Sequence, residues 1–271
     1  LSYTNKTITN TKNTMNINTS NPVNKTLNLS ICGENEVDFD VIKNVATPEA
    51  SNRWHPIAHD CLVENFRESV KNSDLQIVNE HHALAREDNH YFGMFQVRGN
   101  NLSRKHDSEV GTVMCLRNSH DKAFRAGIAA GDAPFVCSNL IFDNEIVLGR
   151  RHTTNILRDL PTIMSQAIGL LKDTWQTTDN RITAYKALDL DDKTAHDLIV
   201  RSFRAGACTK SQMADVITQW HNPEHEEFGS RDLWSLQNAF TNVYRGGTLR
   251  LPRRSQSLLS VLDGHTETIA A

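Results

Sequence analysis

The sequence has few cysteines, and no two of them lie close together. There are five, an odd number, and none forms a CxxC pair: Cys32, Cys61, Cys115, Cys137 and Cys208. This spacing argues against both a disulfide framework and a structural zinc site, so we expect a reducing, cytoplasmic setting. Cys137 follows an apolar pair, and an inert buried thiol is expected there.

Long apolar runs and cofactor motifs are also missing. No stretch approaches the roughly 20 apolar residues that cross a bilayer, and the chain does not start with charged residues followed by an apolar run. We therefore expect neither export nor a membrane partner. Gly127, Gly131 and Gly149 form neither a GxGxxG motif nor a phosphate-binding loop that ends in Gly-Lys-Ser/Thr. The sequence therefore predicts no cofactor.

A strong net charge is absent as well. The formal charge of -3 over 271 residues gives no general attraction to nucleic acid, so any surface that binds a polyanion must be a local patch. The first thirty residues contain eight Asn and seven Thr and bury too little apolar surface to fold alone. We expect a mostly disordered tail over 1–46, one domain over 47–262 and a flexible end over 263–271.

Within the domain, the hydrophobic pattern changes from strands to helices. The spacing of apolar residues predicts a helix over 57–71, followed by strands over 75–86, 90–98, 111–118, 133–142 and 145–150. After residue 153 the period becomes helical, and N-caps are expected at Asp191 or Asp192, at Thr209 or Ser211, and at Ser230 or Asp232. The prediction is an α+β fold, with a mostly antiparallel sheet in 47–152 and helices in 153–246.

Three polar clusters interrupt the strand-rich part. They are Asn118-Ser119-His120-Asp121, Cys137-Ser138-Asn139 and Arg150-Arg151-His152. Polar residues at strand ends lie where loops converge, which is where binding sites are commonly built. The first cluster has the residue types of a nucleophilic triad, but sequence neighbours rarely reach triad geometry, and a hydrogen-bonded turn explains it as well. We predict no catalytic residue, with His120 and Asp121 as the weak candidates.

The histidines offer one metal-like pattern. His221 to His225 matches HxxEH, in which two histidines on one helix bind zinc. Pro223 in its middle disfavours a helix, so we predict a loop. His81, His82 and His90 could meet across a hairpin, but His81 and His82 face opposite sides of a strand. No metal site is predicted.

Basic residues are the remaining clue. They cluster around the polar motifs and again after the last strong helix, in RGGTLRLPRR. Guanidinium groups suit phosphate, although they could equally be solvated or paired with Asp132, Asp143 and Glu145. Trp175, Trp220 and Trp234 occupy apolar helical positions, which favours the core over base stacking.

Several separated motifs carry a resemblance. LRNSHDKAFRAGIAAGDAPFVCSNLIF is followed by GRRHTTN, by the segment 220–228 and by DLWSLQNAFTNVYRG. In this order they resemble the phage/plasmid-like family of uncharacterised proteins found on mobile elements, and the resemblance covers residues 55–262. It implies carriage on phages and plasmids, and it supplies neither an activity nor catalytic residues.

The favoured function is nucleic-acid binding, with single-stranded DNA preferred, in replication, recombination or protection of such an element. The residues expected to contact phosphate are Arg117, Arg125, Arg150, Arg151, Arg250, Arg253 and Arg254, and those expected to contact bases are Asn118, His120 and Asn139. One alternative is a metal-dependent hydrolase or nuclease that uses His120 and Asp121. Another is a protein that inhibits a host enzyme, and a homo-oligomer remains open.

Overall fold

The computed structural model describes residues 26–27, 35–100, 104–134, 141–244 and 251–270. In these ranges the N-terminal half forms a six-stranded antiparallel sheet, in which each strand pairs with the next along the chain. The strands are β1 (Asn35–Val37), β2 (Leu75–Ala85), β3 (His90–Gly99), β4 (Val110–Ser119), β5 (Ala126–Pro134) and β6 (Ile141–Arg150). Antiparallel neighbours need only short connections, so consecutive strands can pair directly.

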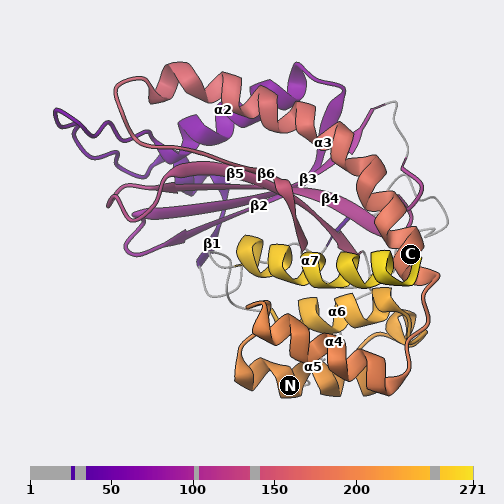
Figure 1. Cartoon of the computed structure of the whole chain (residues 1–271). Coiled ribbons are helices and arrows are strands. Elements are labelled where there is room, and N and C mark those ends of the chain that lie inside the picture. Colours follow the sequence, from indigo (N-terminus) through magenta and orange to yellow (C-terminus); the bar gives the residue numbers. More distant parts are fainter. Residues whose placement is uncertain (1–25, 28–34, 101–103, 135–140, 245–250, 271) are drawn as a thin grey trace, which may run out of the picture.

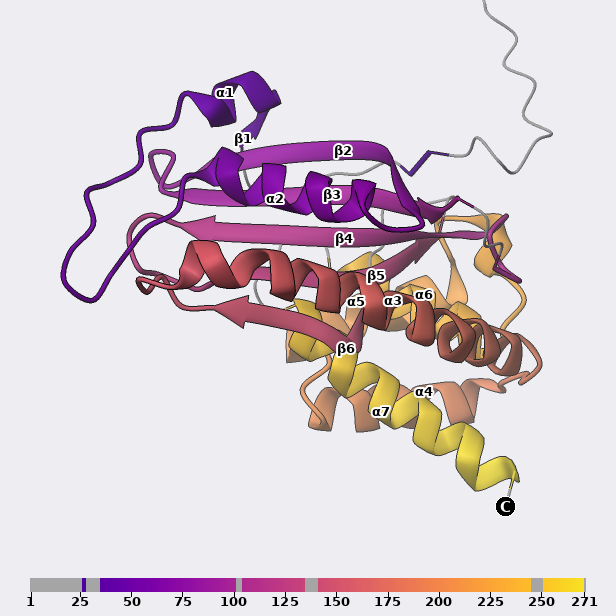
Figure 2. The same ribbon diagram turned by 90° about the horizontal axis from the view of Figure 1, so that it is seen from above.

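Helices cover both faces of the sheet, and the fold is α+β as predicted (Figures 1 and 2). The helices are α1 (Phe39–Lys43), α2 (His59–Lys71), α3 (Ile156–Lys186), α4 (Asp192–Arg204), α5 (Lys210–His221), α6 (Leu233–Val243) and α7 (Leu251–Ala270). One face packs against α2 and the first part of α3, and the other against α4 to α7. None of the helices in the described ranges has both the length and the apolar character needed to cross a membrane.

Each face of the sheet supplies its own hydrophobic core. Phe95 and Met114 point towards α2, where they meet Phe66, whereas Phe92 and Val113 point towards the α4–α7 layer. This division follows from the alternation of side chains along each strand. The helix α3 has 31 residues, about 46 Å at 1.5 Å per residue, and it contributes to both cores. It therefore joins the two layers.

A buried ion network attaches α3 to the sheet. Arg104, 9% exposed, donates to Asp132 on β5 (Nη1 to Oδ1, 2.5 Å) and to Asp179 on α3 (Nη2 to Oδ1, 3.0 Å). Thr112 on β4 also accepts from Arg104, at 2.7 Å, and the Trp175 indole N–H donates to the same hydroxyl at 2.9 Å. Burial opposes the charge on Arg104, but the two carboxylates dominate and raise its pKa. The network therefore holds a charged arginine inside the protein.

The predicted β2–β3 hairpin and the helices after residue 153 are confirmed, while two strands, β1 and β5, were missed. The sequence predicted a strand over 133–142, but β5 lies at Ala126–Pro134 and β6 begins at Ile141. Residues 135–140, including Cys137 and Asn139, lie outside the described residues. The glycines that suggested a turn, Gly127 and Gly131, lie within β5. A Cβ on Gly127 would lie only 3.1 Å from the Leu148 carbonyl oxygen of β6, which explains a glycine at this position.

Part of the expected tail and all of the described C-terminal end are ordered. β1 pairs with β2, Ile42 of α1 is 1% exposed, and the Leu27 N–H donates to Gln96 Oε1 at 2.7 Å. At the other end, α7 continues to Ala270, and Asp263 accepts hydrogen bonds from Arg181 and Tyr185. These apolar and charged contacts explain why the expected disorder does not extend to these residues.

Side-chain caps begin three of the helices at predicted positions. Asp191 caps α4, Thr209 forms a capping box with Gln212 at the start of α5, and Asp232 caps α6. Gly206, with a φ of +86°, follows the end of α4. A residue without a Cβ adopts this left-handed conformation at little cost, so Gly206 favours the end of the helix here.

Replacing Asp232 with alanine should lower the free energy of unfolding by about 1–2 kcal/mol, because the N-cap bonds are lost. Asp232 is 5% exposed, and its Oδ1 accepts from the backbone N–H of Ser235 at 2.7 Å. Urea unfolding of D232A would measure this loss. The matched control is D215A, an exposed position within α5, which should change stability by less than about 0.5 kcal/mol. Equal effects of both variants would contradict the capping role.

Candidate functional site

Four connecting segments meet at one end of the sheet, which we call the strand-end site. They are the β2–β3 turn (86–89), the β4–β5 turn (120–125), the residues after β6 (151–155) and the segment before α2 (51–58). The His120 N–H donates to Asn89 O at 2.8 Å, and the His55 N–H donates to His152 O at 2.9 Å. The arrowheads of β4 and β6 point to this end in Figure 2, and α4 to α7 lie away from it.

Asn118, on β4, is the centre of a buried cluster beneath α2. Its Nδ2 donates to Ile57 O and to His59 Nδ1, both at 2.9 Å, and its Oδ1 accepts from His152 Nε2 at 2.7 Å. His120 Nε2 donates to the same Ile57 carbonyl at 2.9 Å. We call Tyr91, His59, Asn118, His120 and His152 the histidine core. Every polar bond of Asn118 is therefore made within the protein.

The three histidines of the core are neutral. The rings of His59 and His120 stack with centroids 3.8 Å apart, and their Nε2 atoms donate to the backbone carbonyls of Asp88 and Ile57. Burial, with repulsion from His120, lowers the pKa of His59 to about 3. Burial likewise lowers the pKa values of His120 and His152. The histidine core is thus an uncharged support beneath the surface loops.

Tyr91 continues this core towards β2. Its ring stacks on His59 at 5.6 Å, and its hydroxyl hydrogen-bonds His82 Nδ1 at 2.9 Å. A Cβ on Gly93 would lie 2.1 Å from the Tyr91 hydroxyl oxygen, so only glycine leaves room for this ring. The fit explains the glycine in the middle of a strand.

Basic side chains surround the histidine core on the converging segments. We call the following residues the basic rim: Arg53, Arg86, Arg117, Lys122, Arg125, Arg150 and Arg151. Of these, Arg117 is half-buried and the others are exposed. Lys122 lies 4.8 Å from the centroid of the Trp54 ring, and Arg117 lies 5.5 Å from that of Phe124. Two cations of the rim therefore lie against aromatic rings at this end of the sheet.

Arg117 lies on a flat part of the sheet surface. The cross-strand row that contains it runs through Phe92, Arg117, Gly127 and Gly149. A Cβ on Gly127 would lie 3.4 Å from Arg117 Nε and 3.1 Å from the Leu148 carbonyl. Burial and the charge of Arg125 lower the pKa of Arg117, and none of the ion pairs among the described residues includes either arginine. The two guanidinium groups thus form an uncompensated cationic pair.

The loops that carry the rim have a strained backbone. Arg86, Glu87 and Asp88 have φ values of +54°, +54° and +62°, and Lys122 has +66°. Each such residue costs about 1 kcal/mol or more, and strain of this kind clusters at functional sites. The strained positions include two cations of the rim. This concentration supports a functional role for the strand-end site.

The predicted phosphate-contacting residues separate into two groups. Arg117, Arg125, Arg150 and Arg151 come together in the basic rim, although Arg150 forms an ion pair with Asp159 at 2.5 Å. Arg253 is exposed near the start of α7, and the charge of Arg254 acts on Cys208 and Tyr244 in the helical layer. Arg250 and Asn139 lie outside the described residues. That the arginines of α7 contact the same nucleic acid as the basic rim stays a prediction.

Two of the residues predicted to contact bases, Asn118 and His120, lie inside the protein. Asn118 is fully buried and His120 is 4% exposed, and both are hydrogen-bonded to Ile57. Their place in the structure is therefore beneath the surface loops. Sequence reasoning missed His59, Tyr91 and Trp54, because each reaches the site only through the pairing of distant segments. It also missed Phe124, which lies within the β4–β5 turn.

His120 and Asp121 have separate partners. Asp121 Oδ2 binds His90 Nε2 at 2.8 Å, and its Oδ1 accepts the Ala123 N–H at 3.0 Å. Desolvation opposes the charge of Asp121, but these two bonds lower its pKa. Ser119 Oγ bonds the backbone of Phe124. The bonds are those of a hydrogen-bonded turn, and the described residues contain no set of three or more His, Cys, Asp or Glu side chains placed to hold a metal.

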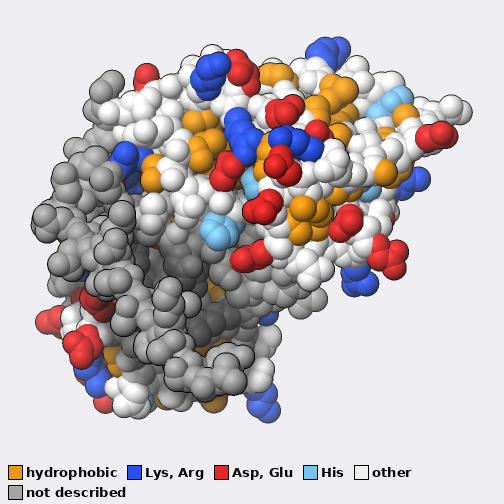
Figure 3. Space-filling model, turned by 180° about the vertical axis from the view of Figure 1, so that it is seen from behind, with side chains coloured by type: hydrophobic (Ala, Val, Ile, Leu, Met, Phe, Trp, Pro, Cys, Tyr) orange, Lys and Arg blue, Asp and Glu red, His pale blue; other side chains and the backbone are white. Residues whose placement is uncertain are grey.

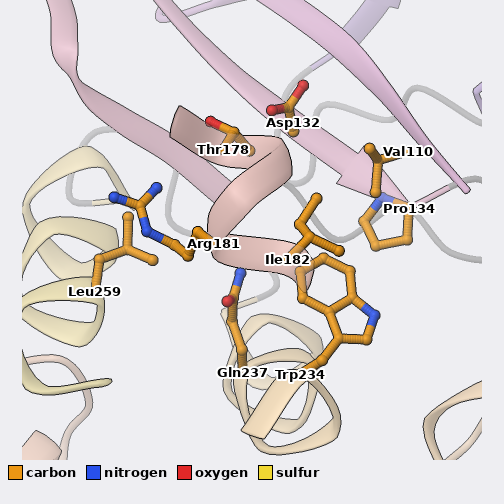
Figure 4. Close-up of a pocket in the computed structure, with 9 residues that line it drawn as sticks. All are labelled: Val110, Asp132, Pro134, Thr178, Arg181, Ile182, Trp234, Gln237 and Leu259. Atoms are coloured by element: carbon orange, nitrogen blue, oxygen red, sulfur yellow. The ribbon is translucent and has the colours of Figure 1, made fainter. Parts of the chain in front are cut away.

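A small cavity lies at the other end of the sheet, between β4, β5, α3, α6 and α7 (Figure 4). Its volume is about 20 Å³, close to that of a single water molecule. In Figure 4 the Gln237 amide points from α6 towards Arg181 on α3. Apart from Asp132, Thr178, Arg181 and Gln237, the lining is apolar: Val110, Pro134, Ile182, Trp234 and Leu259. This space is too small for an organic substrate.

One face of the molecule carries mixed surface charges. On the face shown in Figure 3, Lys and Arg side chains lie among Asp and Glu side chains. Mixed charges of this kind produce little net field at a distance. At the strand-end site, none of the ion pairs among the described residues includes Arg117 or Arg125.

Comparison with protein families gives one match. The model of the domain of unknown function DUF932 matches residues 49–262. The chain belongs to the DUF932 family. The match spans the sheet from β2 onwards and most of the helical layer, so the whole strand-end site lies in the DUF932 domain. Neither the curated proteins nor the solved structures gave a match.

Proposed function

We propose that this DUF932 protein binds nucleic acid, preferably single-stranded DNA, at the strand-end site. The observation that carries the proposal is the Arg117–Arg125 pair beside Phe124, over the glycine row of β5 and β6. Guanidinium groups donate to phosphate oxygens, and aromatic rings stack on bases whatever their sequence. The missing side chains of Gly127 and Gly149 allow Arg117 and Arg125 to lie close against the sheet.

The buried histidine core supports this role by fixing the loops. Asn118 and His120 hold the Ile57 carbonyl, and His152 holds the end of β6 to Asn118. The backbone that carries the cations of the basic rim is then held in one conformation. Binding to a prepared surface loses less conformational entropy than binding to mobile loops.

The wider setting is also part of the proposal. The motif resemblance supports carriage on a phage or plasmid and a place in the host cytoplasm. A protein that covers single strands would act there in replication, recombination or protection of the element. Retention of a labelled strand in the presence of competing duplex DNA would test the preference for single strands.

Fluorescence anisotropy with a labelled oligonucleotide of about 20 nucleotides tests the binding directly. We expect saturable binding that weakens as salt rises from about 50 to 200 mM, because phosphate contacts release counterions. Absence of binding at low salt, or an affinity that does not depend on salt, would contradict the proposal.

The double variant R117Q/R125Q should weaken this binding at least about tenfold, since each charge-assisted bond contributes roughly 1.5 kcal/mol. The slope of log affinity against log salt should become shallower by about 1.4, because each phosphate contact contributes about 0.7 on single strands. The matched control is R201Q/R204Q, which removes two exposed charges from α4. If the control loses as much affinity as the rim variant, binding does not occur at the strand-end site.

A further inference from the structure

Two histidines on neighbouring helices face one another on the surface of the helical layer. His196 lies on α4, and His221 is the last residue of α5. Their Nε2 atoms are 3.2 Å apart, and the rings meet edge to face, with centroids 5.3 Å apart. His221 is the first histidine of the HxxEH pattern. The chain leaves the helix after it, so its partner is on α4 and is not His225.

A carboxylate lies on the side of the His221 ring that faces away from His196. Asp192 Oδ1 lies 3.9 Å from His221 Nδ1, the ring nitrogen that faces away from His196. Trp220 Nε1 donates to the same oxygen at 3.0 Å, and Arg231 forms an ion pair with it. Although Arg231 and Trp220 share the charge of this oxygen, an acceptor on the Nδ1 side favours the tautomer with the proton on that atom. The lone pair of His221 Nε2 is then directed towards His196.

The spacing of the two nitrogens fits a transition metal. Zinc binds histidine nitrogen at about 2.0–2.1 Å, so two ligands of a tetrahedral ion lie about 3.3–3.4 Å apart. The observed 3.2 Å is close to this value. Both side chains are partly exposed, so an ion can enter from solvent. Asp192 Oδ1, 3.9 Å from His221 Nδ1, lies beyond hydrogen-bond distance but on the side where a carboxylate commonly orients a metal-binding histidine.

We propose that His196 and His221 bind a divalent transition metal ion, such as Zn²⁺ or Cu²⁺, through their Nε2 atoms. Water completes the coordination, since no group of three or more ligating side chains occurs among the described residues. The ion connects α4 to α5, and Asp192 is a positioning residue. This site is separate from the strand-end site, which lies at the end of the sheet.

Titration of the full-length protein with Cu²⁺, followed by electron paramagnetic resonance, tests the site. Copper is the most tightly bound divalent ion of its row, and coupling to nitrogen nuclei reports imidazole ligands. We expect one Cu²⁺ per chain with nitrogen coupling. H196Q and H221Q should each weaken binding at least tenfold, and D192N should weaken it by about tenfold.

The control is H225Q, whose imidazole packs against Phe228 and should leave copper affinity unchanged. Zn²⁺ should also raise the melting temperature of the wild type, and not that of H196Q, because binding stabilises the folded state. Copper affinity that is equal in wild type, H196Q and H221Q would overturn the proposal. So would the lack of saturable binding in the wild type.

Discussion

Replacing Arg104 with methionine is expected to lower the free energy of unfolding by about 3–5 kcal/mol. The change leaves Asp132 and Asp179, which are 9% and 5% exposed, without their shared cation. It also removes the bond to Thr112, which links the network to Trp175. Two desolvated carboxylates without a partner are costly, so the penalty exceeds that of losing a surface ion pair. Chemical unfolding followed by circular dichroism would measure the loss.

A control variant distinguishes the stability lost through burial of unpaired carboxylates from that lost by removing an arginine charge. Arg67 forms an ion pair with Glu80, but each side chain is 31% exposed. R67M should therefore cost less than about 1 kcal/mol. Adding D132N and D179N to R104M should recover part of the stability, because the two buried carboxylate charges without a partner are removed. If R104M costs no more than R67M, the buried network does not hold α3 to the sheet.

Lowering the pH from about 6.5 to 5 is expected to destabilise the protein, with a loss of about 2 kcal/mol from His59 alone. An unfolded histidine takes up a proton near pH 6.5, whereas the pKa of folded His59 is about 3. The unfolded state therefore binds more protons in this window, and stability falls as the pH falls. The lowered pKa values of His120 and His152 add to the effect. Urea midpoints at several pH values would measure it.

Glu80 contributes to the pH dependence of stability at a lower pH than the histidines do. His82, whose Nε2 lies 3.7 Å from Glu80 Oε1, and the Arg67 ion pair outweigh desolvation and lower the pKa of Glu80 from 4.5 to about 2. The contribution of Glu80 is therefore lost only below about pH 4.5. H59Q should flatten the pH dependence between 6.5 and 5, whereas H225Q should leave it unchanged. A wild-type stability that is constant across this window would contradict a neutral histidine core.

The elements that local sequence specifies were predictable. The β2–β3 hairpin has alternating apolar residues around a polar turn, and the N-caps Asp191, Thr209 and Asp232 precede periodic apolar residues. The strand β5 was not predictable in the same way, because its small residues have low strand propensity. Its stability comes from neighbours on both sides and from the helices on its two faces. Those contacts are tertiary and leave no local pattern.

The candidate site was predictable only in part. The basic residues at strand ends indicated Arg117 and Arg125, and the structure places them together. The burial of Asn118 and His120 depends on α2 crossing that end of the sheet, which no local pattern encodes. His59 and Asn118 are 59 residues apart in the chain, yet they are hydrogen-bonded. The polar character of a residue alone did not show whether its side chain would be buried beneath the loops or exposed on the surface.

The most direct test of the proposed function is to map where an oligonucleotide touches the protein. A single strand that carries photoreactive thymidine analogues would be crosslinked to the full-length protein, and the modified peptides would be identified by mass spectrometry. We predict crosslinks at Phe124 and Trp54, with fewer in R117Q/R125Q. Crosslinks confined to the α4–α7 layer, or spread evenly over the chain, would contradict a nucleic-acid interface at the strand-end site.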